Sequence, residues 1–89
     1  MTISLNDIKQ RIKELLVSDI YVETPIEEMN DDESLRDSFG VDSMGFVELQ
    51  ALIEAEYSIK VSEEDFNPDN FSTIENLANL INRLMTSEV

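Results

Sequence analysis

The first part of the chain has apolar residues at helical spacing. These positions are Leu5, Ile8, Ile12, Leu15 and Leu16. A repeat of this period places the apolar side chains on one face of a helix, where they can pack on a core. Ser4 followed by Asp7 resembles a capping box, which marks a helix start. The pattern therefore predicts a helix over about residues 4–20.

Two later stretches have the same period. The stripe of the first is Phe46, Leu49, Ile53 and Tyr57. It predicts a helix that begins near Ser43 and ends at Tyr57 or Ser58. The stripe of the second is Ile74, Leu77, Ala78, Ile81, Leu84 and Met85. It predicts a helix that ends at about residue 86, after a capping box from Ser72 to Glu75.

A long acidic connection, residues 21–41, lies between the first two helices. Pro25 breaks the helical pattern, and we expect four apolar residues to hold the segment against the core, with a helical turn near 34–38. These residues are Ile26, Met29, Leu35 and Phe39. The spacing excludes a calcium-binding EF-hand, because a frame that starts at Asp31 has Arg36 where glycine is required. No metal site is predicted.

Residues 62–71 predict a turn capped by Ser62 and then a short helix with Asn67 as cap and Pro68 as first residue. Phe66 and Phe71 are expected to close the core. No alternation typical of strands and no internal repeat is present. The sequence thus predicts an all-α bundle, with three main helices, one short helix and a long loop between the first and second. With a length of 89 residues, the chain is expected to form one domain over residues 1–89.

Composition excludes several functions. Twenty acidic residues face six basic ones, for a net charge of −14, which excludes nucleic-acid binding and disfavours anionic membranes. Acidity of this degree attracts basic protein surfaces, although it also serves solubility alone. Cysteine and histidine are absent, so the chain lacks the commonest metal ligands and general base. We find no signal peptide or spanning segment, and expect a cytoplasmic monomer.

Candidate chemistry is concentrated at Asp42 and Ser43. Both are residue types that cap helices, and an Asp-Ser pair before a helix most often does only that. Wherever the cap falls, Ser43 lies at the positive end of the helix dipole with its hydroxyl near solvent. Such a position stabilises an anionic group attached to the serine oxygen, because unpaired backbone N–H groups also face it.

Motif and spacing then indicate a family. Gly40-Val41-Asp42-Ser43-Met44, followed by Val47-Glu48-Leu49, resembles the attachment motif of acyl carrier proteins, Gly-x-Asp-Ser-(Leu/Met) with an apolar-Glu-Leu group after it. Ser34-Leu35 and Phe39-Gly40 are similar to the loop that leads into that motif. The stretch from Glu54 to Val61 is similar to the family's acidic helix end and short apolar connection. The resemblance covers nearly the whole chain and is strongest over residues 34–84.

The resemblance implies a small four-helix bundle of acyl-carrier type and a function without catalysis. A separate Mg²⁺-dependent phosphopantetheinyl transferase would attach 4′-phosphopantetheine covalently to Ser43, while Asp42 caps the helix and helps to position that enzyme. The thiol of the arm would carry acyl groups as thioesters between enzymes of fatty-acid, polyketide or related biosynthesis. Lipid-like cargo would lie between helices at residues with apolar side chains. These residues are Phe46, Ile53, Phe66 and Ile74.

A docking face is also implied by the resemblance. Met44 and Val47 fall off the core stripe and are flanked by Glu48 and Glu54, so they form an apolar patch ringed by carboxylates. Acyl-transferring and condensing enzymes with basic surfaces are the expected partners. Gly45 departs from the family pattern, since many relatives have an acidic residue there.

Alternatives remain open at this point. Residues 62–73 resemble stand-alone carriers, including the D-alanyl subfamily, so the cargo of an aminoacyl or peptidyl carrier is possible. An unmodified acidic interaction module is a second alternative. A hydrolase that uses Ser43 is the third, and it is weak, because no histidine is present to activate the hydroxyl.

Overall fold

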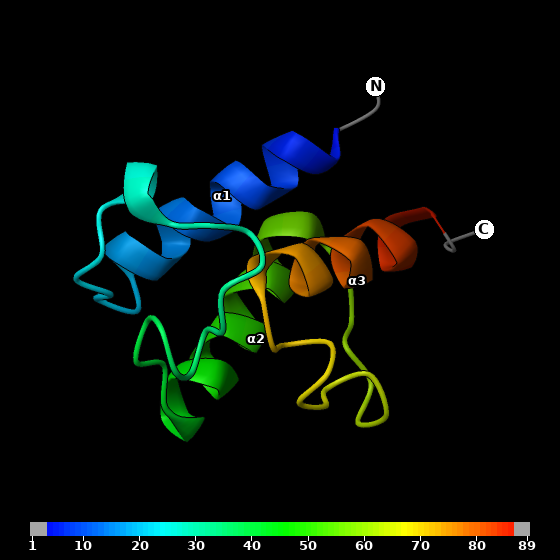
Figure 1. Ribbon diagram of the computed structural model, residues 1–89. Coiled ribbons are helices and arrows are strands. Elements are labelled where there is room, and N and C mark those ends of the chain that lie inside the picture. Colours follow the sequence, from blue (N-terminus) through cyan, green and yellow to red (C-terminus); the bar gives the residue numbers. More distant parts are fainter. Residues whose placement is uncertain (1–3, 87–89) are drawn as a thin grey trace.

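Three α-helices and one short 3₁₀ turn make up the fold (Figure 1). The structure is a computed structural model, and it describes residues 4–86. Its elements are α1 (Leu5–Ser18), the 3₁₀ turn η1 (Ile26–Glu28), α2 (Ser43–Tyr57) and α3 (Ile74–Thr86). Over residues 4–86 there is no strand, and an isolated antiparallel bridge joins Ser34 to Thr73. The all-α prediction is confirmed.

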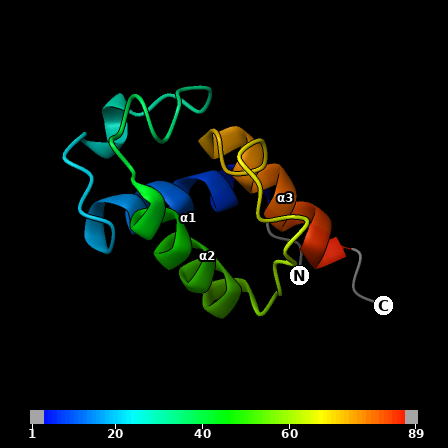
Figure 2. The ribbon, with the colours of Figure 1, turned by 90° about the horizontal axis from the view of Figure 1, so that it is seen from below.

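The helices enclose a single apolar core. α1 packs most extensively on α3, and α2 contacts both (Figure 2). The predicted stripe of α1 is buried at Ile8, Ile12, Leu15 and Leu16. In α2 the buried residues are Leu49 and Ile53, with Phe46 and Tyr57 half-buried at the edge of the core. Burial of these side chains is the main source of stability in so small a domain.

Side-chain caps fix where the helices begin. Ser4 Oγ accepts the N–H of Asp7 at 3.1 Å, as the sequence predicts for α1. At α3 the predicted capping box from Ser72 to Glu75 is wrong. Thr73 Oγ1 accepts the N–H of Asn76 at 3.0 Å, whereas the Ser72 hydroxyl donates backward to the Asp69 carbonyl at 2.8 Å.

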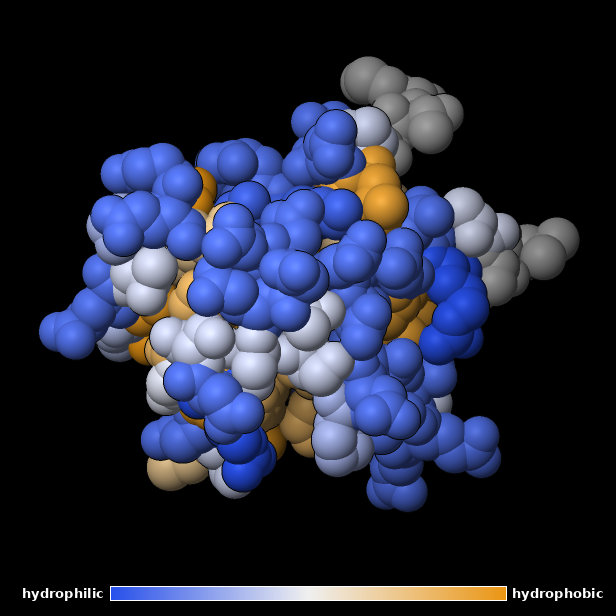
Figure 3. Space-filling model, in the orientation of Figure 1, coloured by the Kyte–Doolittle hydropathy of each residue, from blue (hydrophilic) through white to orange (hydrophobic). Residues whose placement is uncertain are grey.

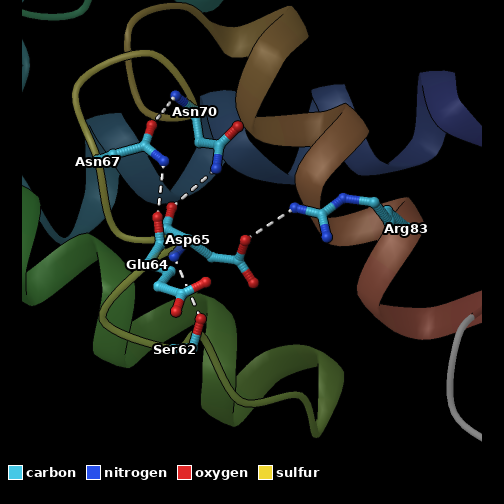
Figure 4. A network of polar contacts seen from close by, with 6 residues as sticks. All are labelled: Ser62, Glu64, Asp65, Asn67, Asn70 and Arg83. Atoms are coloured by element: carbon cyan, nitrogen blue, oxygen red, sulfur yellow. Dashed lines mark hydrogen bonds and ion pairs between the residues drawn. The ribbon is translucent and has the colours of Figure 1, made fainter.

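The predicted short helix at Pro68 is not formed, and the short helical element lies instead at η1, in the connection between α1 and α2. Residues 63–71 form turns, and Figure 4 shows the reason. Asn67 Nδ2 donates to the Glu64 carbonyl at 2.8 Å, and Asn70 Nδ2 donates to the Asp65 carbonyl at 2.9 Å. Asparagine side chains that bind nearby backbone in this way compete with helix formation.

The expected cap at Asn67 is nevertheless present, because its Oδ1 accepts the N–H of Asn70 at 2.8 Å. Arg83 of α3 ties the same segment down through an ion pair with Asp65 at 3.0 Å (Figure 4). Phe71 is buried and meets the half-buried Phe66 edge to face, with ring centroids 5.0 Å apart. The prediction that these two aromatic residues close the core is confirmed.

The connection at 21–41 is held against the core at several points. Met29, Leu35 and Phe39 are buried as expected, and Ile26 is half-buried. The expected turn near 34–38 is present, with the Ser38 N–H donating to the Ser34 carbonyl at 2.9 Å. A long segment without helix is therefore ordered by apolar contacts along its length.

An ion-pair cluster adds to this attachment. Asp31 lies 3.2 Å from Lys9 Nζ and 3.1 Å from Lys13 Nζ, both on α1. Its backbone carbonyl accepts the N–H of Glu75 at the start of α3, at 3.0 Å. Burial alone would raise the pKa of the Asp31 carboxyl, but the hydrogen-bonded ion pairs with Lys13 and Lys9 outweigh it and lower that pKa.

Candidate functional site

The start of α2 presents a serine to solvent. Asp42 has extended backbone (φ −95°, ψ −177°) and its Oδ1 accepts the N–H of Gly45 at 2.8 Å, so Asp42 is the N-cap. Ser43 is consequently the first residue of the helix, at the positive end of its dipole. The side chain of Ser43 is exposed, and within residues 4–86 its hydroxyl makes no hydrogen bond. This oxygen is free to react.

The loop before the serine sets its position. Gly40 has a φ of +72°, in the left-handed region that side chains with a Cβ rarely adopt. The next residue, Val41, is buried, and its N–H donates to the Leu35 carbonyl at 3.0 Å. The glycine of the motif thus turns the chain, and Val41 anchors it one residue before the cap.

One side of this first helical turn opens onto a cleft of about 620 Å³, which we call the apolar cleft. Its lining residues are Ser34, Arg36, Ser43, Phe46, Val47, Phe66, Asn67, Pro68, Phe71 and Ser72. Figure 3 shows hydrophilic residues over most of one face, with apolar atoms set back between the start of α2 and the segment after it. Of the residues expected to shelter cargo, Phe46 and Phe66 line this cleft. Ile53 and Ile74 do not, because they are fully buried in the core.

The opposite side of the same turn borders a second cleft of about 690 Å³, which we call the acidic cleft. Five carboxylates line it, from Asp19, Glu23, Asp37, Asp42 and Glu48. Tyr21 also lines it, and this residue is 80% exposed and has a φ of +65°. No cationic residue of the described chain lines this cleft, so it carries a strong negative potential.

Gly45 lines the acidic cleft, and the structure explains its place in the helix. A Cβ at this position would lie 3.0 Å from Val41 Cγ1 and 3.4 Å from the capping Oδ1 of Asp42. Glycine lets the first turn of α2 approach the buried Val41 closely. Close packing against Val41 therefore accounts for a glycine at the position where many relatives have an acidic residue.

The residues predicted to contact partners fall into two groups. Met44 and Val47 are 82% and 57% exposed, and Glu48 beside them is exposed as well. Glu54 has a structural role that sequence reasoning missed. Its Oε2 accepts the N–H of Val61 at 2.7 Å and so holds the chain that follows α2.

Arg36 is another residue that the sequence did not single out. It follows the buried Leu35 and is itself exposed, and its guanidinium carbon lies 5.8 Å from the centroid of the Phe46 ring; both residues line the apolar cleft. One feature of the sequence could have indicated it: Arg36 is the one basic residue between Lys13 and Lys60, in an otherwise acidic stretch.

The residues around Ser43 fit a phosphate-linked group. A phosphodiester on its oxygen would face unpaired N–H groups of the first helical turn, which favour an anion. The apolar cleft next to the serine gives an attached chain an apolar surface to contact. Among residues 4–86, no group of three or more carboxylates is placed to hold a metal ion. None of the helices over that range is both long and apolar enough to cross a bilayer.

Comparison with known proteins agrees with this geometry. A family model described as "Phosphopantetheine attachment site" matches residues 10–81. An acyl carrier protein of Streptomyces coelicolor is 35% identical over 77 residues, covering 84% of this chain and 82% of that protein. An acyl carrier protein of Solidesulfovibrio magneticus is 31% identical over 58 residues, covering 65% of this chain and 72% of that protein.

The chain belongs to the acyl carrier protein family. Its cofactor is accordingly 4′-phosphopantetheine, and the protein is a carrier and not an enzyme. The hydrolase alternative is thereby set aside. An acyl carrier protein acts together with the enzymes that modify it and process its acyl groups. Because the family model spans α1 to α3, the match covers both clefts and the turn between them.

Proposed function

We propose that Ser43 is the residue that carries the 4′-phosphopantetheine arm. The observation that supports this most strongly is the exposed, unbonded hydroxyl at the first position of α2, next to the apolar cleft. Of the other hydroxyls that border the two clefts, Ser34 and Ser72 are half-buried and hydrogen-bonded within the fold. Ser43 alone among these three combines exposure with the positive end of a helix.

The modification needs a separate transferase. In the proposed step, Ser43 Oγ forms a bond to the phosphorus that carries the pantetheine arm of coenzyme A. The bond from that phosphorus to the bridging oxygen breaks, adenosine 3′,5′-bisphosphate leaves, and a base of the transferase takes the hydroxyl proton. Mg²⁺ bound by the transferase neutralises the phosphates. Asp42 keeps the first turn of α2 in place through its bond to Gly45.

The loaded protein then carries acyl groups as thioesters between enzymes of fatty-acid, polyketide or related biosynthesis. The names of both relatives, "Acyl carrier protein", favour acyl over aminoacyl cargo. Loading assays distinguish these cargoes, since an aminoacyl carrier of the D-alanyl type accepts its cargo from an ATP-dependent ligase. We place this activity in the cytoplasm, on a monomer.

Partners dock on the exposed start of α2. Met44 and Val47 offer an apolar contact, and Glu48 adds a carboxylate at the edge of the acidic cleft. Basic surfaces on the partner enzymes complement this combination. Glu54 contributes charge to the same helix while its carboxylate remains bound to the Val61 N–H.

The test is the intact mass of the chain after incubation with coenzyme A, Mg²⁺ and a promiscuous phosphopantetheinyl transferase. We expect one phosphopantetheine on the wild type and none on Ser43→Ala. Ser38→Ala is the matched control, because Ser38 is an exposed serine that lines the acidic cleft. Addition to Ser43→Ala, or no addition to a folded wild type with a transferase of the native host, would refute the proposal.

A further inference from the structure

Arg36 differs from most basic residues of the chain. Lys9, Arg11, Lys13 and Arg83 all form ion pairs with carboxylates within the fold. Arg36 forms none within residues 4–86, and it lies against the ring of Phe46 instead. Arg36 is exposed where it lines the apolar cleft, so in a chain with a net charge of −14 its guanidinium is available to bind an anionic group.

The backbone that carries Arg36 is fixed. The preceding residue, Leu35, is fully buried, and its N–H donates to the Ser72 carbonyl at 2.9 Å. On the other side, the Ser34 hydroxyl accepts the N–H of Asp37 at 3.0 Å and closes the turn. The side chain therefore projects from an ordered turn, and the contact with Phe46 restricts it further. Less side-chain entropy remains to be lost when the guanidinium binds an anion.

Ser43 lies on the same cleft as this guanidinium. Ser43 and Phe46 are three residues apart on α2, so their Cβ atoms are about 5–6 Å apart on one face of the helix. The Arg36 guanidinium carbon is 5.8 Å from the Phe46 ring, and Arg36 and Ser43 line the same cleft. A group attached to Ser43 Oγ therefore begins at the edge of the cleft that Arg36 and Phe46 also line.

We propose that Arg36 is a positioning residue, which binds the phosphodiester on Ser43 and directs the start of the arm over the apolar cleft. This inference rests on the proposed attachment to Ser43. A guanidinium pairs with phosphate oxygens through charge-assisted, often bidentate, hydrogen bonds. The five carboxylates of the acidic cleft repel the same phosphodiester from the opposite side of the helical turn. Both forces move the arm toward the cleft that contains Arg36.

The experiment compares apo and holo protein by NMR. In the wild type, we expect the Arg36 Nε–Hε signal to shift on conversion to the holo form by more than its linewidth. The ³¹P signal of the phosphodiester should differ between holo wild type and holo Arg36→Gln, with Arg36→Lys between them. Lys60→Gln is the control, since Lys60 is exposed, outside both clefts and without an ion pair in the described chain.

The outcomes separate the two proposals. If the wild type acquires no phosphopantetheine, the attachment proposal itself fails. If it does, but the Arg36 Nε–Hε signal is unchanged between apo and holo protein, Arg36 only packs on Phe46 and the inference is overturned. That comparison needs no variant, so it decides the question even if Arg36→Gln is modified slowly. A ³¹P signal that moves equally in Lys60→Gln and Arg36→Gln would reduce the effect to net charge and also overturn the inference.

Discussion

The two clefts on either side of the first turn of α2 are similar in volume, about 620 and 690 Å³, but opposite in chemistry. Ser43, Phe46 and Val47 face the apolar cleft, whereas Asp42, Gly45 and Glu48 face the acidic one. Residues three or four apart share a helix face, so neighbouring residues at the start of α2 line different clefts. The comparison teaches that the two sides of one helical turn differ in chemistry: Ser43, the proposed attachment residue, lines the apolar cleft, and the carboxylates lie on the other side.

The largest expected difference between the clefts is in stability. Phe71 lines the apolar cleft and is 3% exposed, so Phe71→Ala should lower the free energy of unfolding by about 3–5 kcal/mol. Glu23→Ala, at an exposed carboxylate of the acidic cleft, should change it by less than about 0.5 kcal/mol. Urea denaturation followed by circular dichroism measures both. Phe71→Leu replaces the alanine variant if that variant does not fold. Equal losses of stability at the two clefts would contradict the expected difference between them.

Recognition should depend on the acidic cleft. Glu48→Lys places a cation beside the remaining carboxylates, and we expect kcat/KM of the transferase to fall by roughly tenfold at low salt. The deficit should shrink as ionic strength rises, because screening weakens the attraction in the wild type. Glu63→Lys is the matched control, since Glu63 is exposed outside both clefts and the change in net charge is the same. An equal loss in the control would assign the effect to net charge.

Asp42, the N-cap of α2 that lines the acidic cleft, should contribute less to stability than Phe71 does. Asp42→Ala removes the acceptor of the Gly45 N–H and should lower the free energy of unfolding by about 1 kcal/mol. Asp42→Asn keeps an oxygen acceptor at the same place and should recover most of that loss. Urea denaturation of the two variants separates the hydrogen bond from the charge. Should both variants be equally destabilised, the carboxylate charge would matter more than the cap.

The smallest effect is a pH dependence in the segment that contributes to both clefts. Because the ion pairs with Lys13 and Lys9 outweigh burial, the pKa of Asp31 is lower in the folded chain than in the unfolded one. Its contribution to stability is therefore complete above the unfolded pKa of about 3.9 and is lost as the pH falls through the folded pKa.

Asp31→Asn should accordingly be less stable than the wild type at neutral pH, by less than about 1 kcal/mol, since the carboxylate is partly exposed. The difference should narrow as the pH is lowered below about 4. Thermal unfolding at neutral and acidic pH measures it. A difference that stays constant through this range would show that the carboxylate has no lowered pKa.

The helices could be predicted because their signals are local. Stripes of apolar residues at helical spacing placed α1, α2 and α3 within two residues of their observed ends, and the cap at Asp42 follows from its side chain. The short helix at Pro68 was predicted wrongly, because the side-chain bonds of Asn67 and Asn70 to backbone carbonyls depend on how the segment folds back. The cap at Thr73 is a similar case, since Ser72 is an equally good capping residue in sequence.

The site was partly predictable for the same reason. The motif indicates Ser43 and Asp42 directly, because the two residues are neighbours in sequence, at the N-cap and first position of α2. The contacts of Arg36 and Glu54 were not predicted, because each joins α2 to another segment of the chain: Arg36 to Phe46, and Glu54 to Val61. Tertiary contacts of this kind leave no periodic trace in the sequence.

The most direct test of this account is to locate the arm on the chain. The holo protein would be digested and its peptides sequenced by tandem mass spectrometry, with coverage of the serines that border both clefts: Ser34, Ser38, Ser43 and Ser72. The account predicts phosphopantetheine on Ser43 alone, at the first position of α2. Phosphopantetheine on Ser38 of the acidic cleft, or on any residue other than Ser43, would contradict it.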